Sequence, residues 1–151
     1  MIIIGIDPGT TAIGFAALRS DKPRISTSAA AKGGTHESEV VLRGKRLRLL
    51  EAELFPITAT DQSERLAELH RTLKQRMERI KPDAVAVEKL FFAKNVKTAM
   101  AVAEARGVIL LTAAEARANV YEYAPAEIKK TVTGHGGADK KAIEKMILLT
   151  L

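Results

Sequence analysis

The sequence predicts a single α/β domain built around a mixed sheet. Short apolar runs rich in β-branched residues come first, and amphipathic stretches then alternate with further apolar runs, with turn residues between them. A length of 151 residues suits one domain, and 46% hydrophobic residues are enough for its core. We therefore expect residues 1–151 to form one domain, and disorder is excluded as the main description.

Composition restricts the classes of function. The chain has no Cys, which excludes a disulfide framework, a zinc site built on cysteines and a thiol nucleophile. The apolar start is interrupted by Asp7, long before the roughly 18 residues that a membrane span needs, so we expect no membrane association and a cytoplasmic location. A net charge of +6 is compatible with a polyanion-binding surface without requiring one.

The first part of the chain predicts a β-hairpin and then less regular segments. The runs Ile2–Asp7 and Ile13–Leu18 are joined by the turn residues Pro8-Gly9-Thr10. A third strand is expected over Arg24–Ala31, and the stretch from Glu39 to Ile57 is compatible with either strands or a helix.

A clear amphipathic helix follows, with Asp61 or Ser63 as its N-cap and Lys81-Pro82 at its end. Its apolar residues recur every three or four positions: Leu66, Leu69, Leu73, Met77 and Ile80. The opposite face of this helix is charged.

The remaining elements alternate. Residues 83–88 predict a buried central strand, and a long helix runs from Asn95 to about Ala116, with Gly107 in its middle. Because Gly lowers helix propensity, we expect Gly107 to allow close packing against a neighbouring backbone. A strand over residues 119–123, a short helix beginning at Pro125, a glycine loop and a last helix from Ala138 complete the chain.

Two acidic residues end predicted strands. Asp7 and Glu88 lie at the carboxyl ends of apolar runs, where open α/β sheets place their ligand sites. If the two strands are neighbours, the carboxylates converge and their oxygens suit Mg²⁺, or Mn²⁺, for phosphodiester hydrolysis. Each acid taken alone can also be a turn or cap residue. The nearby Gly5, Gly9 and Gly14 serve either the turn or close approach of a phosphate.

Aromatic and basic residues follow these acids. One of Phe91 and Phe92 can belong to the core, while the other is free to stack on or wedge between bases. Five lysines near the C-terminus can clamp a sugar-phosphate backbone or simply form a solvated helix face. They are Lys129, Lys130, Lys140, Lys141 and Lys145.

Three motifs together resemble the RuvC family of Holliday junction resolvases. They are Gly5-Ile6-Asp7-Pro8-Gly9-Thr10; Val87 to Asn95 with Ala105-Arg106-Gly107 downstream; and Tyr123-Ala124-Pro125 with Gly134-x-Gly136-x-Ala138-Asp139-Lys140 and Met146. The resemblance implies an RNase H-like mixed sheet flanked by helices. It also implies a homodimer packed through the helix after Asn95, and Mg²⁺-dependent nicking of four-way DNA junctions, with two ions in the complete site.

The resemblance assigns roles to individual residues. Asp7 and Glu88 match the first two metal-binding acids of the family, which are also its catalytic acids. Phe91 matches the aromatic residue that stacks at the junction, and Lys129 and Lys140 match basic residues near the scissile phosphate. The DNA-binding residues that we predict are Phe91, Phe92, Asn95, Lys129 and Lys140. The family's usual partner is the RuvA and RuvB branch-migration complex.

Two departures from the family pattern matter. The interval of about 38–60 is longer than expected and contains the basic cluster Arg43–Arg48, which either extends the DNA surface or lengthens a hairpin. The family takes its remaining metal ligands from a further C-terminal helix, and no acid after Glu88 matches them. The uncapped apolar end of the chain leads us to expect a fragment or a shortened gene product that binds junctions but cleaves weakly or not at all.

Three alternatives stay open at this point. A non-catalytic DNA-binding module would use the basic surface and Phe91 without a metal. A related RNase H-like nuclease would act on RNA, because phosphate contacts do not distinguish RNA from DNA. An actin-like ATPase or a small phosphotransferase is supported by the first hairpin alone.

Overall fold

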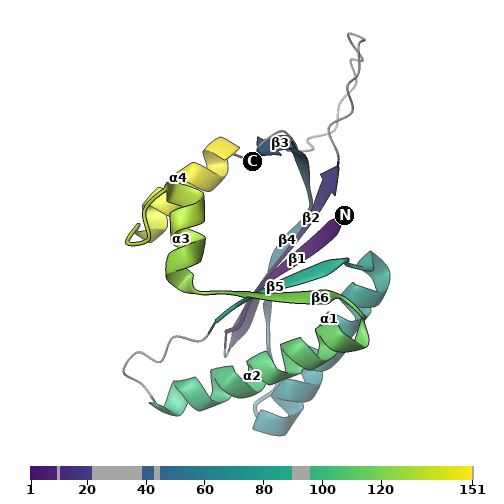
Figure 1. The fold of residues 1–151 in the computed structure, drawn as a ribbon. Coiled ribbons are helices and arrows are strands. Elements are labelled where there is room, and N and C mark those ends of the chain that lie inside the picture. Colours follow the sequence, from purple (N-terminus) through teal and green to yellow (C-terminus); the bar gives the residue numbers. More distant parts are fainter. Residues whose placement is uncertain (10, 22–38, 43–44, 90–95, 151) are drawn as a thin grey trace.

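A six-stranded mixed sheet forms the centre of the part of the chain that the structure describes (Figure 1). The structure is a computed structural model, and it describes residues 1–9, 11–21, 39–42, 45–89 and 96–150. The strands are β1 (Ile2–Asp7), β2 (Ala12–Asp21), β3 (Glu39–Leu42), β4 (Lys45–Pro56), β5 (Ala84–Glu88) and β6 (Asn119–Tyr123). The helices are α1 (Gln62–Ile80), α2 (Val96–Glu115), α3 (Pro125–Thr133) and α4 (Lys140–Thr150).

The strand order is β3-β4-β2-β1-β5-β6. Strand β1 pairs antiparallel with β2 and parallel with β5, and β5 pairs parallel with β6. Strand β4 pairs antiparallel with both β2 and β3. As a result, the carboxyl ends of β1, β5 and β6 lie side by side at one edge of the sheet.

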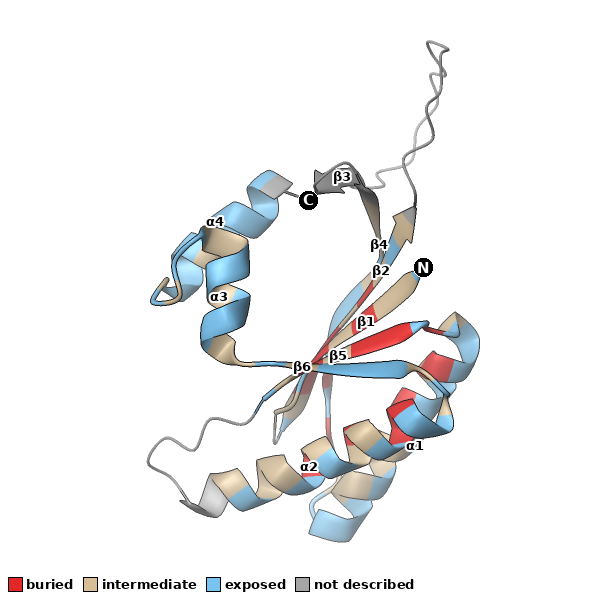
Figure 2. Ribbon diagram, in the orientation of Figure 1, coloured by how far each residue is buried: buried red, intermediate tan, exposed pale blue. Residues whose placement is uncertain are grey.

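Helices α1 and α2 cover one face of the sheet, and α3 and α4 lie on the other side of it (Figure 1). The core between the sheet and the first two helices is aliphatic, and its best-buried members lie on both layers (Figure 2). Fully buried residues include Ile4, Ile13, Leu73, Val85 and Ile109. The alternation of apolar residues along the strands and their three-to-four spacing along α1 directs these side chains into one layer.

Helix α1 has the ends that the sequence predicts. The side chain of Asp61 accepts hydrogen bonds from the backbone N–H groups of Ser63 and Glu64, so Asp61 is the N-cap. Lys81 ends the helix in the left-handed region with φ of 53°, ahead of Pro82. Both ends are therefore confirmed.

Arginine 76 attaches α1 to the sheet. Its guanidinium lies 5.3 Å and 5.0 Å from the ring centroids of Phe15 and Phe55. It also forms ion pairs with Glu51 and Glu53 of β4. The helix is thus positioned across β2 and β4 by contacts that combine charge with aromatic surface.

The predicted first hairpin, the buried strand before Glu88 and the strand at residues 119–123 are confirmed. Within the stretch from Glu39 to Ile57 the structure has the strands β3 and β4, because β4 pairs with β2 along the full length of β2. The third strand expected at residues 24–31 lies outside the described residues.

Two expectations about the helices are wrong. The last helix begins at Lys140 rather than Ala138, because the side chain of Asp139 accepts a hydrogen bond from the N–H of Ala142 and caps the helix there. Within the described part of this one chain, no backbone packs closely at Gly107, where nothing lies within 4 Å of the position that a Cβ would take.

None of the helices in the described ranges is long and apolar enough to cross a membrane.

Candidate active site

Asp7 and Glu88 end two neighbouring parallel strands. Ile6 of β1 is the register partner of Val87 of β5, so the next residue on each strand lies side by side at the same sheet edge. The preceding side chains of Ile6 and Val87 are buried in the core, and alternation places both carboxylates on the opposite face. Asp7 is exposed and Glu88 is partly buried. The convergence that the sequence predicted for these two acids is therefore present.

Asp7 acts on the neighbouring carboxyl group of Glu88. Burial raises the pKa of the Glu88 carboxyl, and the negative charge of Asp7 and a hydrogen bond with its side chain raise it further. A nearby cation opposes this shift, because the charge of Lys129 lowers the same pKa. The pair thus holds excess negative charge that a divalent cation would neutralise.

Lysine 129 reaches this site from α3. The helix starts directly after β6, with Pro125 in its first turn. Glu127 caps this start by accepting a hydrogen bond of 2.6 Å from the backbone N–H of Ala124. This start places Lys129 one turn beyond the sheet edge that carries Glu88. The predicted DNA-binding residue Lys129 is therefore beside the carboxylate pair.

Glycine 14 leaves room for the Asp7 side chain. Gly14 of β2 is the register partner of Asp7, and a Cβ at Gly14 would lie 3.2 Å from the Cβ of Asp7. Gly9 has a different role, since a Cβ there would collide with the carbonyl oxygen of Ala12 across the turn. Gly9 is therefore needed for the tight turn, and Gly14 leaves the space that the Asp7 side chain occupies.

The donor set fits Mg²⁺. This ion typically takes one or two protein carboxylates and completes an octahedron with water and phosphate oxygens. The adjacent, partly exposed carboxylates of Asp7 and Glu88 satisfy that requirement. In the described ranges, no group of three or more His, Cys, Asp or Glu side chains comes together as a metal site. If only Asp7 and Glu88 supply protein oxygens, most of the coordination positions of the ion would be filled by water and by the substrate.

The other predicted site residues are not all at this edge. Lys140 is exposed at the start of α4, on the helical pair formed with α3. The predicted DNA-binding residues Phe91, Phe92 and Asn95 lie outside the residues that the structure describes. The structure thus groups Asp7, Glu88 and Lys129.

Tyr123 lies at the same sheet edge but is not among the site residues predicted from the sequence. It ends β6 and is the register partner of Glu88. Its place at the end of the predicted strand at residues 119–123, directly before Ala124-Pro125, is the sequence signal that corresponds to this position.

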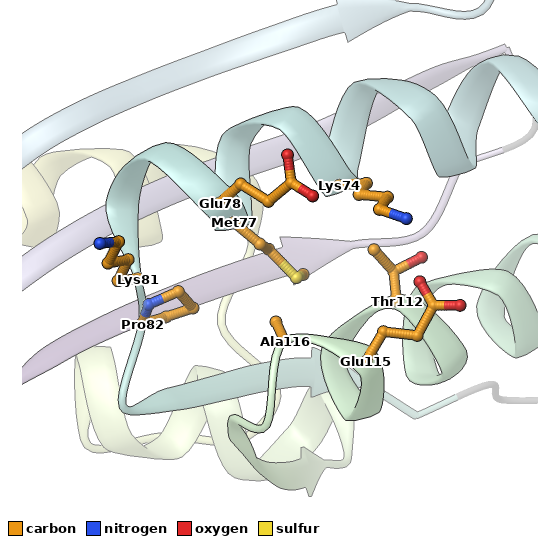
Figure 3. A pocket seen from close by; sticks show the side chains of 8 residues that line it. All are labelled: Lys74, Met77, Glu78, Lys81, Pro82, Thr112, Glu115 and Ala116. Carbon is orange, nitrogen blue, oxygen red and sulfur yellow. The ribbon is translucent and has the colours of Figure 1, made fainter.

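A cavity of about 550 Å³ lies at the other end of the helical layer (Figure 3). It is formed by the end of α1, by Pro82 ahead of β5, and by the end of α2. Its lining residues are Lys74, Met77, Glu78, Lys81, Pro82, Thr112, Glu115 and Ala116. Because this cavity adjoins the amino end of β5, it is separate from the carboxylate pair at the carboxyl end.

The mixed sheet with helices on its two sides has the RNase H-like fold of the solved resolvase structures that it matches. A family model described as crossover junction endodeoxyribonuclease RuvC matches residues 37–151. The chain belongs to the RuvC family.

Individual relatives agree with this assignment. A crossover junction endodeoxyribonuclease RuvC of Chloroflexus aggregans is 41% identical over 152 residues, covering 100% of this chain and 79% of the relative. The solved structure of Thermus thermophilus RuvC in complex with a Holliday junction substrate superposes with a TM-score of 0.75 at 31% identity, covering 100% of this chain and 79% of that one. The yeast mitochondrial Holliday junction resolvase Ydc2, at 11% identity and a TM-score of 0.60 over 98% of this chain and 63% of that one, shares the fold.

Proposed function

We propose that this chain is a RuvC-type endonuclease that binds four-way DNA junctions and hydrolyses a phosphodiester bond in a Mg²⁺-dependent reaction. The observation that carries the proposal is the placement of Asp7 and Glu88 side by side at the carboxyl edge of an RNase H-like sheet, in a chain of the RuvC family. One relative with this fold, Thermus thermophilus RuvC, was solved in complex with a Holliday junction substrate, which supports the same substrate here.

In this mechanism the carboxylates of Asp7 and Glu88 would hold the metal, with two ions in the complete site. When bound, Mg²⁺ would lower the pKa of an attacking water and offset negative charge on the phosphoryl oxygens. Lys129 lies beside Glu88 and attracts the phosphate, and Lys140 extends the basic surface along α4. Phe91, Phe92 and Asn95, in the segment that follows Glu88 in the sequence, complete the proposed DNA contacts.

A homodimer through α2 is part of the proposal. Met100, Gly107 and Leu111 are exposed and lie on one stripe of the helix, separated by seven and four residues. A Cβ at Gly107 would have open space around it, which leaves room for a second helix to approach. This stripe supports self-association, which is measured by sedimentation of the wild-type chain against Leu111→Arg.

The remaining parts of the proposal concern the chain as a whole. Residues 1–151 act as one nuclease domain in the cytoplasm, and the basic hairpin within residues 38–60 adds to the DNA surface. A RuvA and RuvB branch-migration complex is the proposed partner. Cleavage by the chain as given is expected to be weak, because Asp7 and Glu88 are the two acids at the site among the described residues.

The test compares junction binding and nicking by the wild-type chain, Asp7→Asn, Glu88→Gln and the control Glu78→Gln. Glu78 is exposed on α1 beside the cavity at the opposite sheet edge. We expect Mg²⁺ or Mn²⁺ binding, measured by calorimetry, to be lost in the first two variants and kept in the control.

Two results would redirect the assignment. Unchanged metal binding in Asp7→Asn, together with retained junction binding, would indicate a non-catalytic DNA-binding module. Equal affinity for DNA and RNA junctions of the same sequence would favour an RNase H-like nuclease acting on RNA.

A further inference from the structure

Tyrosine 123 stands in the same row of the sheet as the two carboxylates. Asp7 and Glu88 follow the register partners Ile6 and Val87, and Glu88 is itself the register partner of Tyr123. Side chains at matching register positions of neighbouring strands project from the same face. Asp7, Glu88 and Tyr123 therefore rise side by side from three adjacent strands.

The fold holds the backbone of Tyr123 but does not use its side chain. The carbonyl oxygen of Tyr123 accepts a hydrogen bond of 2.8 Å from the N–H of Lys89, which fixes it next to Glu88. Its side chain is 44% exposed and does not belong to the buried core. Among the described residues, no hydrogen bond engages its hydroxyl. The backbone of Tyr123 is thus held next to Glu88, and its hydroxyl is available to a ligand.

The position of the hydroxyl suits a phosphate. Neighbouring strands are about 4.8 Å apart, and side chains stand roughly perpendicular to a sheet. Tyrosine is longer than aspartate or glutamate, so its hydroxyl can reach farther from the sheet than the two carboxylates. A phosphate group bound above Glu88 would also lie beyond the carboxylates, within the reach of a tyrosine on the neighbouring strand.

The charge around Tyr123 favours the same ligand. Lys129 approaches Glu88 from α3, which begins directly after Tyr123. A phosphate that enters from the β6 side of Glu88 therefore meets a cation and a hydroxyl donor together. A hydroxyl also tolerates the nearby carboxylates, because it adds no charge to the site.

We propose that the Tyr123 hydroxyl donates a hydrogen bond to a backbone phosphate of the DNA strand bound at the carboxylate pair. Tyr123 is then a substrate-contacting residue that sets the register of the strand relative to Asp7 and Glu88. This inference rests on the proposed function, because it requires DNA at this edge of the sheet.

The experiment measures the affinity of the protein for a synthetic four-way junction in EDTA, which separates binding from cleavage. The proteins are the wild-type chain, Tyr123→Phe, Tyr123→Ala and the control Tyr121→Ala. Tyr121 is on the same strand and the same face, is 51% exposed, and lies two residues behind the carboxylate row. Each protein is also tested on junctions in which a single phosphate near the crossover is replaced by an uncharged methylphosphonate.

We expect Tyr123→Phe to bind the unmodified junction about tenfold more weakly, since it loses one hydrogen bond to a charged group. The loss should disappear on the junction in which the contacted phosphate is neutral, because the two changes then remove the same interaction. Tyr121→Ala should bind every junction within about twofold of the wild-type chain.

Three results would overturn the inference. Wild-type affinity of Tyr123→Phe together with weak binding by Tyr123→Ala would mean that the ring stacks and the hydroxyl is unused. An equal loss on all modified junctions, or an equal loss in Tyr121→Ala, would mean a non-specific surface effect. If the wild-type chain does not prefer the junction over duplex DNA, the proposed function itself fails, and the inference fails with it.

Discussion

At the scale of single residues, the site depends on the two positions that flank the exposed side chain of Asp7. Its negative charge raises the pKa of the Glu88 carboxyl on one side, and Gly14 faces it on the other. A metal site is sensitive to such neighbours, because ligand oxygens that shift by a few tenths of an ångström no longer match the geometry that Mg²⁺ demands.

The first prediction concerns Gly14. In Gly14→Ala the new Cβ would lie 3.2 Å from the Cβ of Asp7 and would push that side chain aside. We expect the affinity for Mn²⁺ to fall about tenfold, measured by calorimetry. Gly5→Ala is the matched control, since a Cβ there meets nothing within 4 Å. Equal metal affinities for the two variants would contradict this account of Gly14.

At the scale of elements, α1 is tied to the structure at its start and along its length. Asp61 caps the first turn, while Glu68 binds the segment that leads into the helix by accepting hydrogen bonds from the N–H groups of Thr58 and Ala59. Arg76 and Arg79 then contact β4 through Glu51. These polar contacts fix the helix on the sheet in the one orientation that buries its apolar side.

The second prediction concerns acid stability. Hydrogen bonds from Ser63 and then Glu64 lower the pKa of the Asp61 carboxyl. A lowered pKa means that the ionised cap stabilises the folded state above the ordinary aspartate value of about 3.9, and that this stabilisation is lost as the pH falls through the folded-state pKa. We expect Asp61→Asn, which still caps the helix, to lose less stability than the wild-type chain between pH 7 and pH 3.

Urea unfolding at both pH values measures this difference. Parallel loss of stability in the two proteins would show that the Asp61 carboxylate contributes nothing that depends on its charge. The comparison is made between proteins that share every other titrating group, so other carboxylates cancel.

The third prediction compares two arginines on the same helix. The side chain of Arg76 is 17% exposed and contacts two aromatic rings and two glutamates, whereas that of Arg79 is 61% exposed and pairs with Glu51 alone. We expect Arg76→Met to lower the free energy of unfolding by about 1–3 kcal/mol. Arg79→Met should change it by less than about 0.5 kcal/mol. Denaturant unfolding measures both values, and a larger effect at Arg79 than at Arg76 would contradict the prediction.

At the scale of the whole molecule, one face of the sheet packs into the hydrophobic core, and the other face does not. Helices α1 and α2 cover the first face (Figure 2). The second face carries the carboxylate row, with Tyr121, Tyr123 and Leu54 exposed. The core and the proposed site thus lie on opposite faces of one sheet. This separation is the reason that site residues can be changed without removing core volume.

The fourth prediction tests that separation. Leu73 is 0% exposed between α1 and the sheet, and Leu54 is 69% exposed on the other face. We expect Leu73→Ala to destabilise the fold by about 2–5 kcal/mol, because it removes buried surface and leaves a cavity. Leu54→Ala should cost less than about 0.5 kcal/mol. Thermal unfolding followed by circular dichroism measures both, and similar losses would mean that the second face is also packed.

Much of the fold follows from local pattern. The spacing of apolar residues from Leu66 to Ile80 predicted α1, and the turn at Pro8-Gly9 predicted the first hairpin. The stretch that became β4 could not be assigned in this way. Its strand conformation depends on pairing with β2, a partner that is distant in the sequence. The start of α4 was missed for a local reason, because the capping role of Asp139 was not recognised.

The sequence by itself determined the residues to which the chemistry is assigned in the proposal: two acids that end apolar runs, within motifs that resemble one family. Only the tertiary structure decided that these acids are neighbours, because strand order is set by pairing between segments about eighty residues apart. It also decided that Lys129 and Tyr123 join them, since β6 pairs with β5 and carries α3 to the same edge. Residue type is a local property, whereas proximity follows from how the whole sheet buries its apolar face.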